Sequence, residues 1–274
     1  MVKKLSVLIL LIIVFSLTSC LNKEQDIPDL PADEQNYADV SNNVDELNNA
    51  DEPQFIKIGD IIEFGGYSWV VLDVRDEALL IITERVIKFM PYHNHYENWD
   101  ENITWKKSDI RKWLNDDFYN SINESERTRI IETHVINDKS PWSFGRWDGE
   151  SHGIRGGNDT TDKIFLLSIN EVVQYFGDSG ALEKGTNENR RDVNMEWPDY
   201  GAYFWGIHDQ YSEIRIAQNF KGEDSIWWLR SPGNHIRRAA LVCAGGYIDL
   251  YGVTAYVEYG IRPALWLTIH VDRG

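Results

Sequence analysis

The sequence is poor in cysteine, with one residue at position 20 and one at position 243. Two cysteines can form at most one bridge, so a framework of several disulfides is excluded. Cys243 stands among apolar and small residues in the stretch AALVCAGG, a setting typical of a buried small hydrophobic side chain rather than of a nucleophile. The domain must therefore be stabilised by an apolar core.

The sequence also lacks an apolar run long enough to cross a membrane. Residues 5–17 are almost purely apolar but fall short of the roughly 20 residues that a spanning helix needs. After Lys3 and Lys4 they suit the hydrophobic region of a signal peptide. Leu17-Thr18-Ser19-Cys20 then resembles a bacterial lipobox. The alternative is an ordinary secretory signal that contains a cysteine.

The lipobox resemblance carries several implications. It implies cleavage before Cys20, a diacylglyceryl group on its sulfur and often a further fatty acyl chain, such as palmitate, on the new amine. Two or three acyl chains on one residue give stable membrane anchoring. We therefore expect a lipoprotein on the extracytoplasmic face of the bacterial cell membrane.

Positive charge is scarce, because 27 Lys and Arg face 44 Asp and Glu, for a net charge of −17. No basic stripe is present, so nucleic acid is excluded as a partner. Residues 22–54 hold ten acidic residues and one basic residue, a composition that predicts a disordered tether. All 11 tryptophans follow it. The expected organisation is a signal peptide at 1–19, a lipidated cysteine and tether at 20–54, and one domain at 55–274.

Recognisable catalytic and metal-binding patterns are missing as well. Gly-x-Ser-x-Gly is absent, and GDSG at 177–180 is ordinary turn chemistry without the other motifs of serine proteases. His93-Asn94-His95 lacks a third ligand, and GGNDTTD at 156–162 lacks EF-hand spacing. Acidic residues are too numerous for a glycosidase pair to be singled out. We therefore expect no metal, no cofactor and no catalysis.

What the sequence does contain is a series of short β-branched and aromatic runs. Residues 61–64, 67–74 and 78–83 are separated by Gly65-Gly66 and by an Arg-Asp-Glu turn, which predicts a three-stranded meander. The C-terminal part alternates turn residues with short apolar runs. Strands are predicted there at 226–230, 239–243, 246–250, 253–257 and 261–269.

Three helices are predicted between these groups of strands. Ser108 is the expected N-cap of an apolar stripe that ends at Phe118. Asn123 and Glu126 resemble a capping box for a helix reaching about residue 132, and Ser168 and Glu171 repeat that pattern after an apolar strand at 162–168. The fold class is therefore α+β, with an antiparallel sheet formed by the chain ends and two or three short helices in the middle.

Four motifs occur in an order that resembles a known family: TWKKSDIRKWLN, TDKIFLLSINE, WWLRSPG and GIRPALWL. They are similar to the bacterial family known as domain of unknown function 6273, which implies no established activity. A Trp-Trp strand, a Gly-rich hairpin and a closing Gly-x-Arg-Pro strand also resemble C-type-lectin-like domains. Formylglycine-generating enzymes share that fold, but their chemistry needs a cysteine pair for copper, which residues 55–274 lack.

The stretch IWWLRSPG is predicted to be scaffold. Neighbouring strand residues point to opposite faces, so Trp227 and Trp228 cannot both line one pocket. Arg230 and Arg262 lie near the ends of strands that are expected to be neighbours, and buried arginines need carboxylate or carbonyl partners. We favour a structural network over an anion-binding site. Its predicted members are Asp109, Arg111, Asp162, Glu171, Arg230 and Arg262.

Two stretches, 140–157 and 195–211, combine aromatic residues with Gly, Pro, Asp and His. Such surfaces suit sugar rings, peptides or another protein, although loop aromatics also fill the undersides of loops. The predicted contacts are Trp142, Phe144, Trp147, Trp197, Tyr203 and Trp205. We expect a non-catalytic binding module for glycan or protein. An envelope-polymer-modifying enzyme and a structural partner in an envelope assembly are the alternatives.

Overall fold

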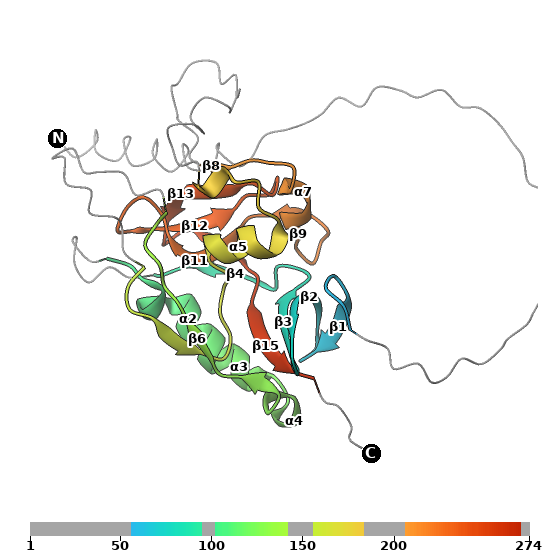
Figure 1. Ribbon diagram of the computed structural model, residues 1–274. Helices are drawn as coiled ribbons and strands as arrows, with labels where there is room; N and C mark the ends of the chain where they lie inside the picture. Colours follow the sequence, from blue (N-terminus) through green and yellow to red (C-terminus); the bar gives the residue numbers. More distant parts are fainter. Residues whose placement is uncertain (1–55, 95–101, 142–155, 184–205, 270–274) are drawn as a thin grey trace, which may run out of the picture.

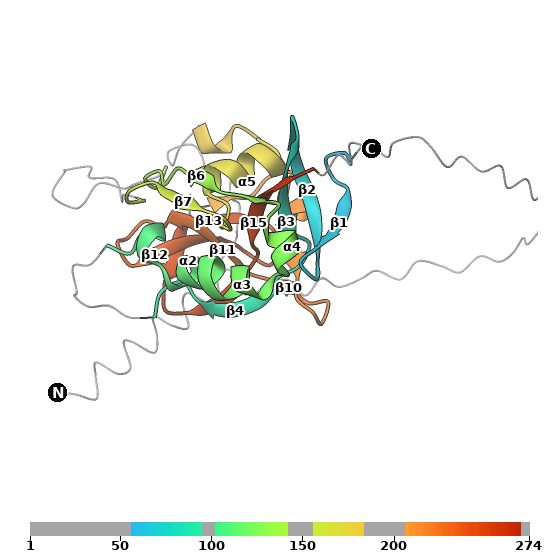
Figure 2. The same ribbon diagram turned by 90° about the horizontal axis from the view of Figure 1, so that it is seen from below.

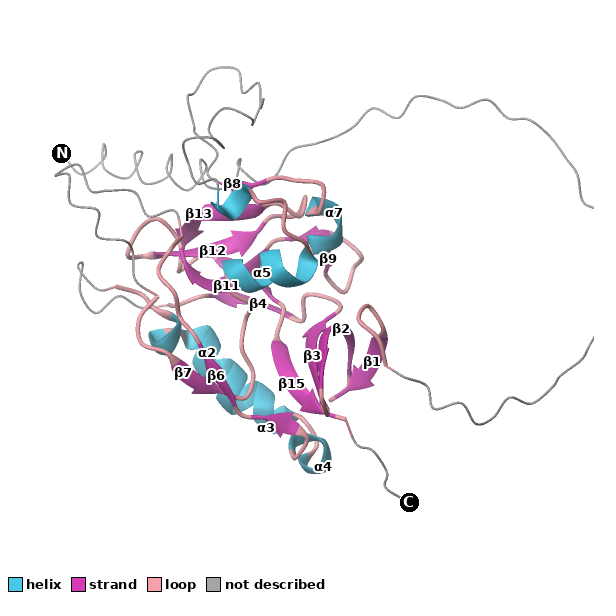
Figure 3. Cartoon of the chain, viewed as in Figure 1, coloured by secondary structure: helices cyan, strands magenta, loops and turns pink. Residues whose placement is uncertain are grey.

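The computed structural model describes residues 56–94, 102–141, 156–183 and 206–269. Strands dominate and helices are short, as Figure 3 shows. The first sheet has five antiparallel strands in the order β1 (Ile61–Phe64), β2 (Tyr67–Arg75), β3 (Ala78–Thr83), β15 (Ala264–Thr268) and β5 (Ile130–Ile131). The predicted fold of mixed helices and strands, with mainly antiparallel sheets and a few short helices, is therefore confirmed.

The meander forms where the sequence predicts it. Gly65 and Gly66 take φ values of 59° and 79°, which suit glycine at the turn between β1 and β2. The last strand, β15, then pairs with β3 from Ala264↔Ile82 to Thr268↔Ala78. The two ends of the domain thus share one sheet, which lies at the lower right of Figure 1.

A second sheet, not foreseen from the sequence, contains the Trp-Trp strand. Its six strands run in the order β4 (Lys88–Pro91), β14 (Glu258–Ile261), β11 (Trp227–Pro232), β12 (Arg238–Val242), β13 (Ile248–Thr254) and β8 (Gly206–Ile207). Only the pairing of β11 with β14 is parallel among these. Because β11 is interior to the sheet, all six of its residues are buried.

Several strand predictions were wrong in their limits, including that of 261–269, where Ile261 ends β14 and β15 begins at Ala264. The strands expected at 246–250 and 253–257 are one strand, β13, which runs through Gly252 at a φ of 70°. In the stretch 162–168, only the first residue belongs to a strand, since β7 (Thr160–Asp162) pairs with β6 (Thr133–Val135). The apolar residues that follow cross between the two sheets as a buried extended segment, bridged at Phe165↔Ala264.

The helices begin at the predicted N-cap residues, Ser108, Asn123 and Ser168. Ser108 Oγ accepts the Arg111 N–H at 3.1 Å, and the helical stretch runs through α2 (Asp109–Trp113), η2 (Leu114–Phe118) and α3 (Tyr119–Ser121). The next helix, α4 (Glu124–Arg127), ends before the predicted residue 132 because Ile130–Ile131 join the first sheet as β5. Its Glu126 carboxylate accepts the Gly65 N–H at 3.0 Å and so ties α4 to the meander.

The core fills the space between the sheets and the helices. Trp69, Trp105, Trp227 and Trp228 are all fully buried, and so is Cys243. Among the described residues, no helix is both long and apolar enough to span a membrane. Seen from below in Figure 2, helix α5 (Ile169–Phe176) and β6 lie on one side of the domain, and β4 lies on the opposite side.

Candidate functional site

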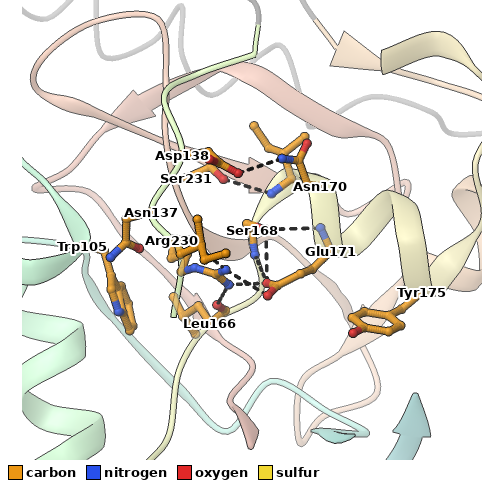
Figure 4. A network of polar contacts seen from close by, with 12 residues as sticks. Trp105, Asn137, Asp138, Leu166, Ser168, Asn170, Glu171, Tyr175, Arg230 and Ser231 are labelled. Atoms are coloured by element: carbon orange, nitrogen blue, oxygen red, sulfur yellow. Dashed lines mark hydrogen bonds and ion pairs between the residues drawn. The ribbon is translucent and has the colours of Figure 1, made fainter. Parts of the chain in front are cut away.

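Arg230 on β11 holds the start of helix α5 against the second sheet. Its guanidinium donates to both carboxylate oxygens of Glu171, at 2.9 Å for Oε1. It also donates to the carbonyl oxygen of Leu166 at 2.8 Å (Figure 4) and to that of Ile136 at 3.1 Å. Arg230 is only 4% exposed. The carboxylate and carbonyl partners together compensate a buried cation.

Glu171 also completes the N-terminus of α5. Its Oε2 accepts the Ser168 N–H at 2.8 Å, and Ser168 Oγ accepts the Glu171 N–H at 3.2 Å, which is the predicted capping box. Ser231, the neighbour of Arg230, accepts the Ile169 N–H at 2.9 Å through its hydroxyl. Strand β11 therefore fixes the first turn of α5 at two adjacent positions.

Arg262 stands apart from this network. Its Nε donates to the Thr83 carbonyl at 2.7 Å, and its guanidinium lies 5.2 Å from the Trp227 ring centroid and 5.6 Å from that of Phe176. Burial lowers its pKa to about 10, while the charge of Glu84 opposes that shift. Within the described ranges, Arg262 forms no ion pair with a carboxylate.

The other predicted network residues form two separate groups. Asp162 is buried and pairs with Arg111 at 2.6 Å, and it accepts the Trp105 indole N–H at 2.7 Å. Asp109 accepts the Asn94 N–H at 2.7 Å and lies 3.3 Å from the His93 imidazole. The six residues thus lie at four locations rather than one: Arg230 with Glu171, Arg262, Arg111 with Asp162, and Asp109.

The two tryptophans of β11 have different surroundings. Trp227 packs against Phe176 of α5 and donates its indole N–H to the Arg215 carbonyl at 3.2 Å. Trp228 packs edge-on against Tyr92 and Tyr259 and donates to the Met90 carbonyl at 3.1 Å. Both rings are core, with their polar atoms paired.

The first aromatic segment leaves and re-enters the domain beside the N-terminal end of α5. The Asn137 N–H donates to Asp159 at 2.8 Å, so the chain before the segment contacts the chain after it. A Cβ on Gly156 would lie 2.2 Å from the Asp138 carbonyl oxygen, which shows how closely the two stretches approach. Asn170 of α5 donates to the Asp138 carboxylate at 3.1 Å (Figure 4).

The second aromatic segment is bounded by a polar clamp at the C-terminal end of α5. Arg215 of α7 (Ser212–Arg215) is fully buried and pairs with Asp209 at 2.8 Å. It also donates to the Gly177 carbonyl at 3.0 Å, and Ser179 donates to Asp209 at 2.7 Å. Burial favours a higher pKa for the Asp209 carboxyl, but the hydrogen bonds from Arg215 and Ser179 outweigh it and hold the pKa below its usual value.

Comparison of the sequence with known protein families gives one match. The family model for a domain of unknown function, DUF6273, covers residues 76–269. The chain belongs to this family. No curated protein and no solved structure matches the chain. The matched span of the DUF6273 domain includes β3 to β15, and with them the Arg230 network, α5 and the Arg215 clamp.

Helix α5 separates the bases of the two aromatic segments in the DUF6273 domain. Asn170 near its N-terminal end contacts Asp138, and Gly177 at its C-terminal end contacts Arg215. Its eight residues correspond to a length of about 12 Å. Asn170 and Gln174 are exposed on its outer face, and the partly exposed Tyr175 hydroxyl accepts from Arg75 at 3.4 Å. Arg75 in turn lies 5.1 Å from the Trp266 ring centroid. This face therefore presents amide, phenol and guanidinium groups.

The predicted ligand contacts of the DUF6273 domain, Trp142, Phe144, Trp147, Trp197, Tyr203 and Trp205, lie outside the described residues. In the parts of the chain that are described, no three His, Cys, Asp or Glu side chains gather as a metal site would require. The Arg215 clamp was missed from the sequence, although Asp209 lies within the second aromatic segment, 195–211. The only sequence signal of the clamp is an Asp just before a short helix and a Ser in a turn.

Proposed function

We propose that this protein is a lipid-anchored, extracytoplasmic module of the bacterial envelope that binds glycan or protein without catalysis. Helix α5 carries the proposal. Its two ends hold the bases of both aromatic segments about 12 Å apart, on a core that fixes them through buried ion pairs. Recognition commonly resides on segments that a rigid scaffold positions in this way.

The spacing limits the ligand to a modest size. About 12 Å corresponds to four residues of an extended peptide at ~3.3 Å each. Aromatic side chains at the two ends of such a span would contact a short chain of sugar rings or a peptide strand at two points. The exposed amide groups of Asn170 and Gln174 on α5 add hydrogen bonds between these contacts.

A binding role is favoured over an enzymatic one by the use of the described carboxylates. Glu171, Asp162 and Asp209 are each engaged by an arginine and by further hydrogen-bond donors. An acid or base in catalysis must instead reach the proton that it transfers. These three carboxylates therefore support structure.

We also propose that the fold is C-type-lectin-like. The shared sheet formed by both chain ends and the interior Trp-Trp strand support this assignment. In a C-type-lectin-like fold the two aromatic segments would lie on a different part of the domain from the end strands β1 and β15. Such a separation suits a receptor that is tethered at one end.

The test is alanine substitution at four positions in the two segments: Trp142, Trp147, Trp197 and Trp205. The variants are expected to keep the thermal stability of the parent chain and to lose capture of envelope glycan fragments or of a cross-linked envelope protein. Trp113→Ala on α2 is the matched control, since Trp113 is a partly buried tryptophan outside both segments. If all four variants melt the domain and none changes capture, the binding proposal is wrong.

A further inference from the structure

A rigid hairpin projects from the side of the domain opposite α5. It joins β9 (Ala217–Gln218) to β10 (Asp224–Ser225) through a turn organised by Asn219. The Asn219 side-chain oxygen accepts the N–H groups of Lys221 at 2.8 Å and Glu223 at 3.2 Å. Its backbone N–H donates to the Glu223 carbonyl at 2.9 Å, and Gly222 adopts a φ of 80°.

This turn holds Phe220 in solvent. Phe220 is 67% exposed, the largest value among the large hydrophobic side chains of the described residues. Single exposed apolar residues are common on protein surfaces. Here, however, the turn has a defined conformation maintained by several hydrogen bonds, so the side chain is displayed at a fixed point rather than left on a loose end.

A second exposed phenylalanine lies on the same side of the domain. The Val86 N–H donates to the Gln218 carbonyl at 2.9 Å, which joins the hairpin to the chain that leads into β4. Phe89 on β4 is 46% exposed. Figure 2 shows β4 and the hairpin together along one side, with α5 and β6 along the other.

Charged residues around the hairpin suit a lipid headgroup region. Arg85, Lys88 and Lys221 are exposed. Glu223 and Asp224 are exposed as well, and each accepts a hydrogen bond within the hairpin, Glu223 from Asn219 at 2.9 Å and Asp224 from Gln218 at 3.3 Å. Exposed aromatic side chains with flanking basic residues are typical of protein surfaces that lie in the membrane interface.

We propose that the β9–β10 hairpin inserts Phe220 into the lipid surface to which the chain is anchored. The inference rests on the lipid anchor in the proposed function. The lipid anchor proposed at Cys20 keeps the domain close to the bilayer. The hairpin is therefore always within reach of the bilayer, and burial of one phenylalanine favours the inserted orientation roughly tenfold to hundredfold.

Insertion at this hairpin would fix the orientation of the domain. Because α5 lies on the opposite side, its outer face, between the bases of the aromatic segments, would face away from the membrane (Figure 2). A ligand in the envelope would then meet those segments directly.

The experiment uses the lipidated full chain in vesicles of phosphatidylethanolamine and phosphatidylglycerol, with or without brominated acyl chains. An apolar aromatic fluorophore is attached through Phe220→Cys, where its rings replace the phenylalanine ring, or through Ile136→Cys as the matched control. Ile136 is 55% exposed and follows β6, on the α5 side. Cys243 is fully buried, so labelling reports the introduced position. The label at 220 is expected to be quenched several-fold more strongly than the label at 136.

A second variant tests whether Phe220 drives the insertion. A label introduced through Phe89→Cys is expected to lose most of its quenching when Phe220→Ser is added. Equal quenching at positions 220 and 136, or no effect of Phe220→Ser, would overturn the inference while the anchor stands. A shift of the label's emission spectrum at higher chain concentration, in the absence of vesicles, would show self-association. That result would also overturn the inference. A chain absent from the vesicles would refute the anchor itself.

Discussion

Replacement of Arg230 by alanine is expected to cost about 3–5 kcal/mol of unfolding free energy. The substitution leaves the Glu171 carboxylate without its cation and removes donors from the Leu166 and Ile136 carbonyls. Leu166 is fully buried, so its carbonyl cannot turn to water, and an unsatisfied buried group costs about 1–3 kcal/mol. The Glu171 side chain is 26% exposed, so water restores part of its solvation and keeps the total within this range.

The assay monitors urea unfolding of the full chain by tryptophan fluorescence. Arg230→Ala is expected to lower the midpoint urea concentration without changing the dependence of the unfolding free energy on urea. Glu171→Gln is the matched control, because it retains an oxygen for the capping box and removes only the charge. It is expected to cost about 1.5–3 kcal/mol. The double variant is expected to lose less than the sum of both single variants, since the two residues interact directly. A loss below about 1 kcal/mol for Arg230→Ala, or strict additivity, would refute this account of the network.

Three further outcomes are expected. Trp227→Ala and Trp228→Ala are each expected to lose about 3–5 kcal/mol in the same urea assay, since both rings are fully buried, and an unchanged midpoint would contradict their place in the core. Burial raises the pKa of the Asp249 carboxyl to about 6, so the folded chain keeps a proton that the unfolded chain loses near pH 4. The resulting contribution to stability falls by roughly 3 kcal/mol as pH rises from about 4 to 6. Asp249→Asn is expected to remove this pH dependence from the unfolding free energy. Cys20→Ala is expected to release the chain from membranes without changing the thermal melt of the domain, and continued membrane fractionation of this variant would contradict the lipobox interpretation.

Local patterns in the sequence predicted local structure well. The meander at β1 to β3 depends on two glycines and on alternating apolar residues, all within about 25 positions. The capping box of α5 depends on Ser168 and Glu171, which are three residues apart. In both cases the residues that determine the conformation are neighbours along the chain, so their spacing carries the information.

Structure that depends on distant residues was not predicted. Strand β4 has the sequence KFMP, which shows no alternation, and becomes a strand only because it pairs with β14. Arg262 and Arg230 look alike in sequence, yet only Arg230 reaches a carboxylate. With 44 acidic residues available, sequence spacing cannot select the pairing of Arg215 with Asp209. The aromatic segments were singled out by composition alone, and their predicted contacts lie outside the described residues.

The position of β15 constrains how the protein reaches its native state in the cell. This strand lies between β3 and β5, and its first residue, Ala264, pairs with Ile82 and bridges to Phe165. Strand β15 is translated after every other strand of the described residues, so neither the sheet nor the crossing between sheets can be completed before it. Closing contacts across so many residues is also slow. The first sheet and the bridge at Phe165 can therefore close only after residues 264–268 have been translated.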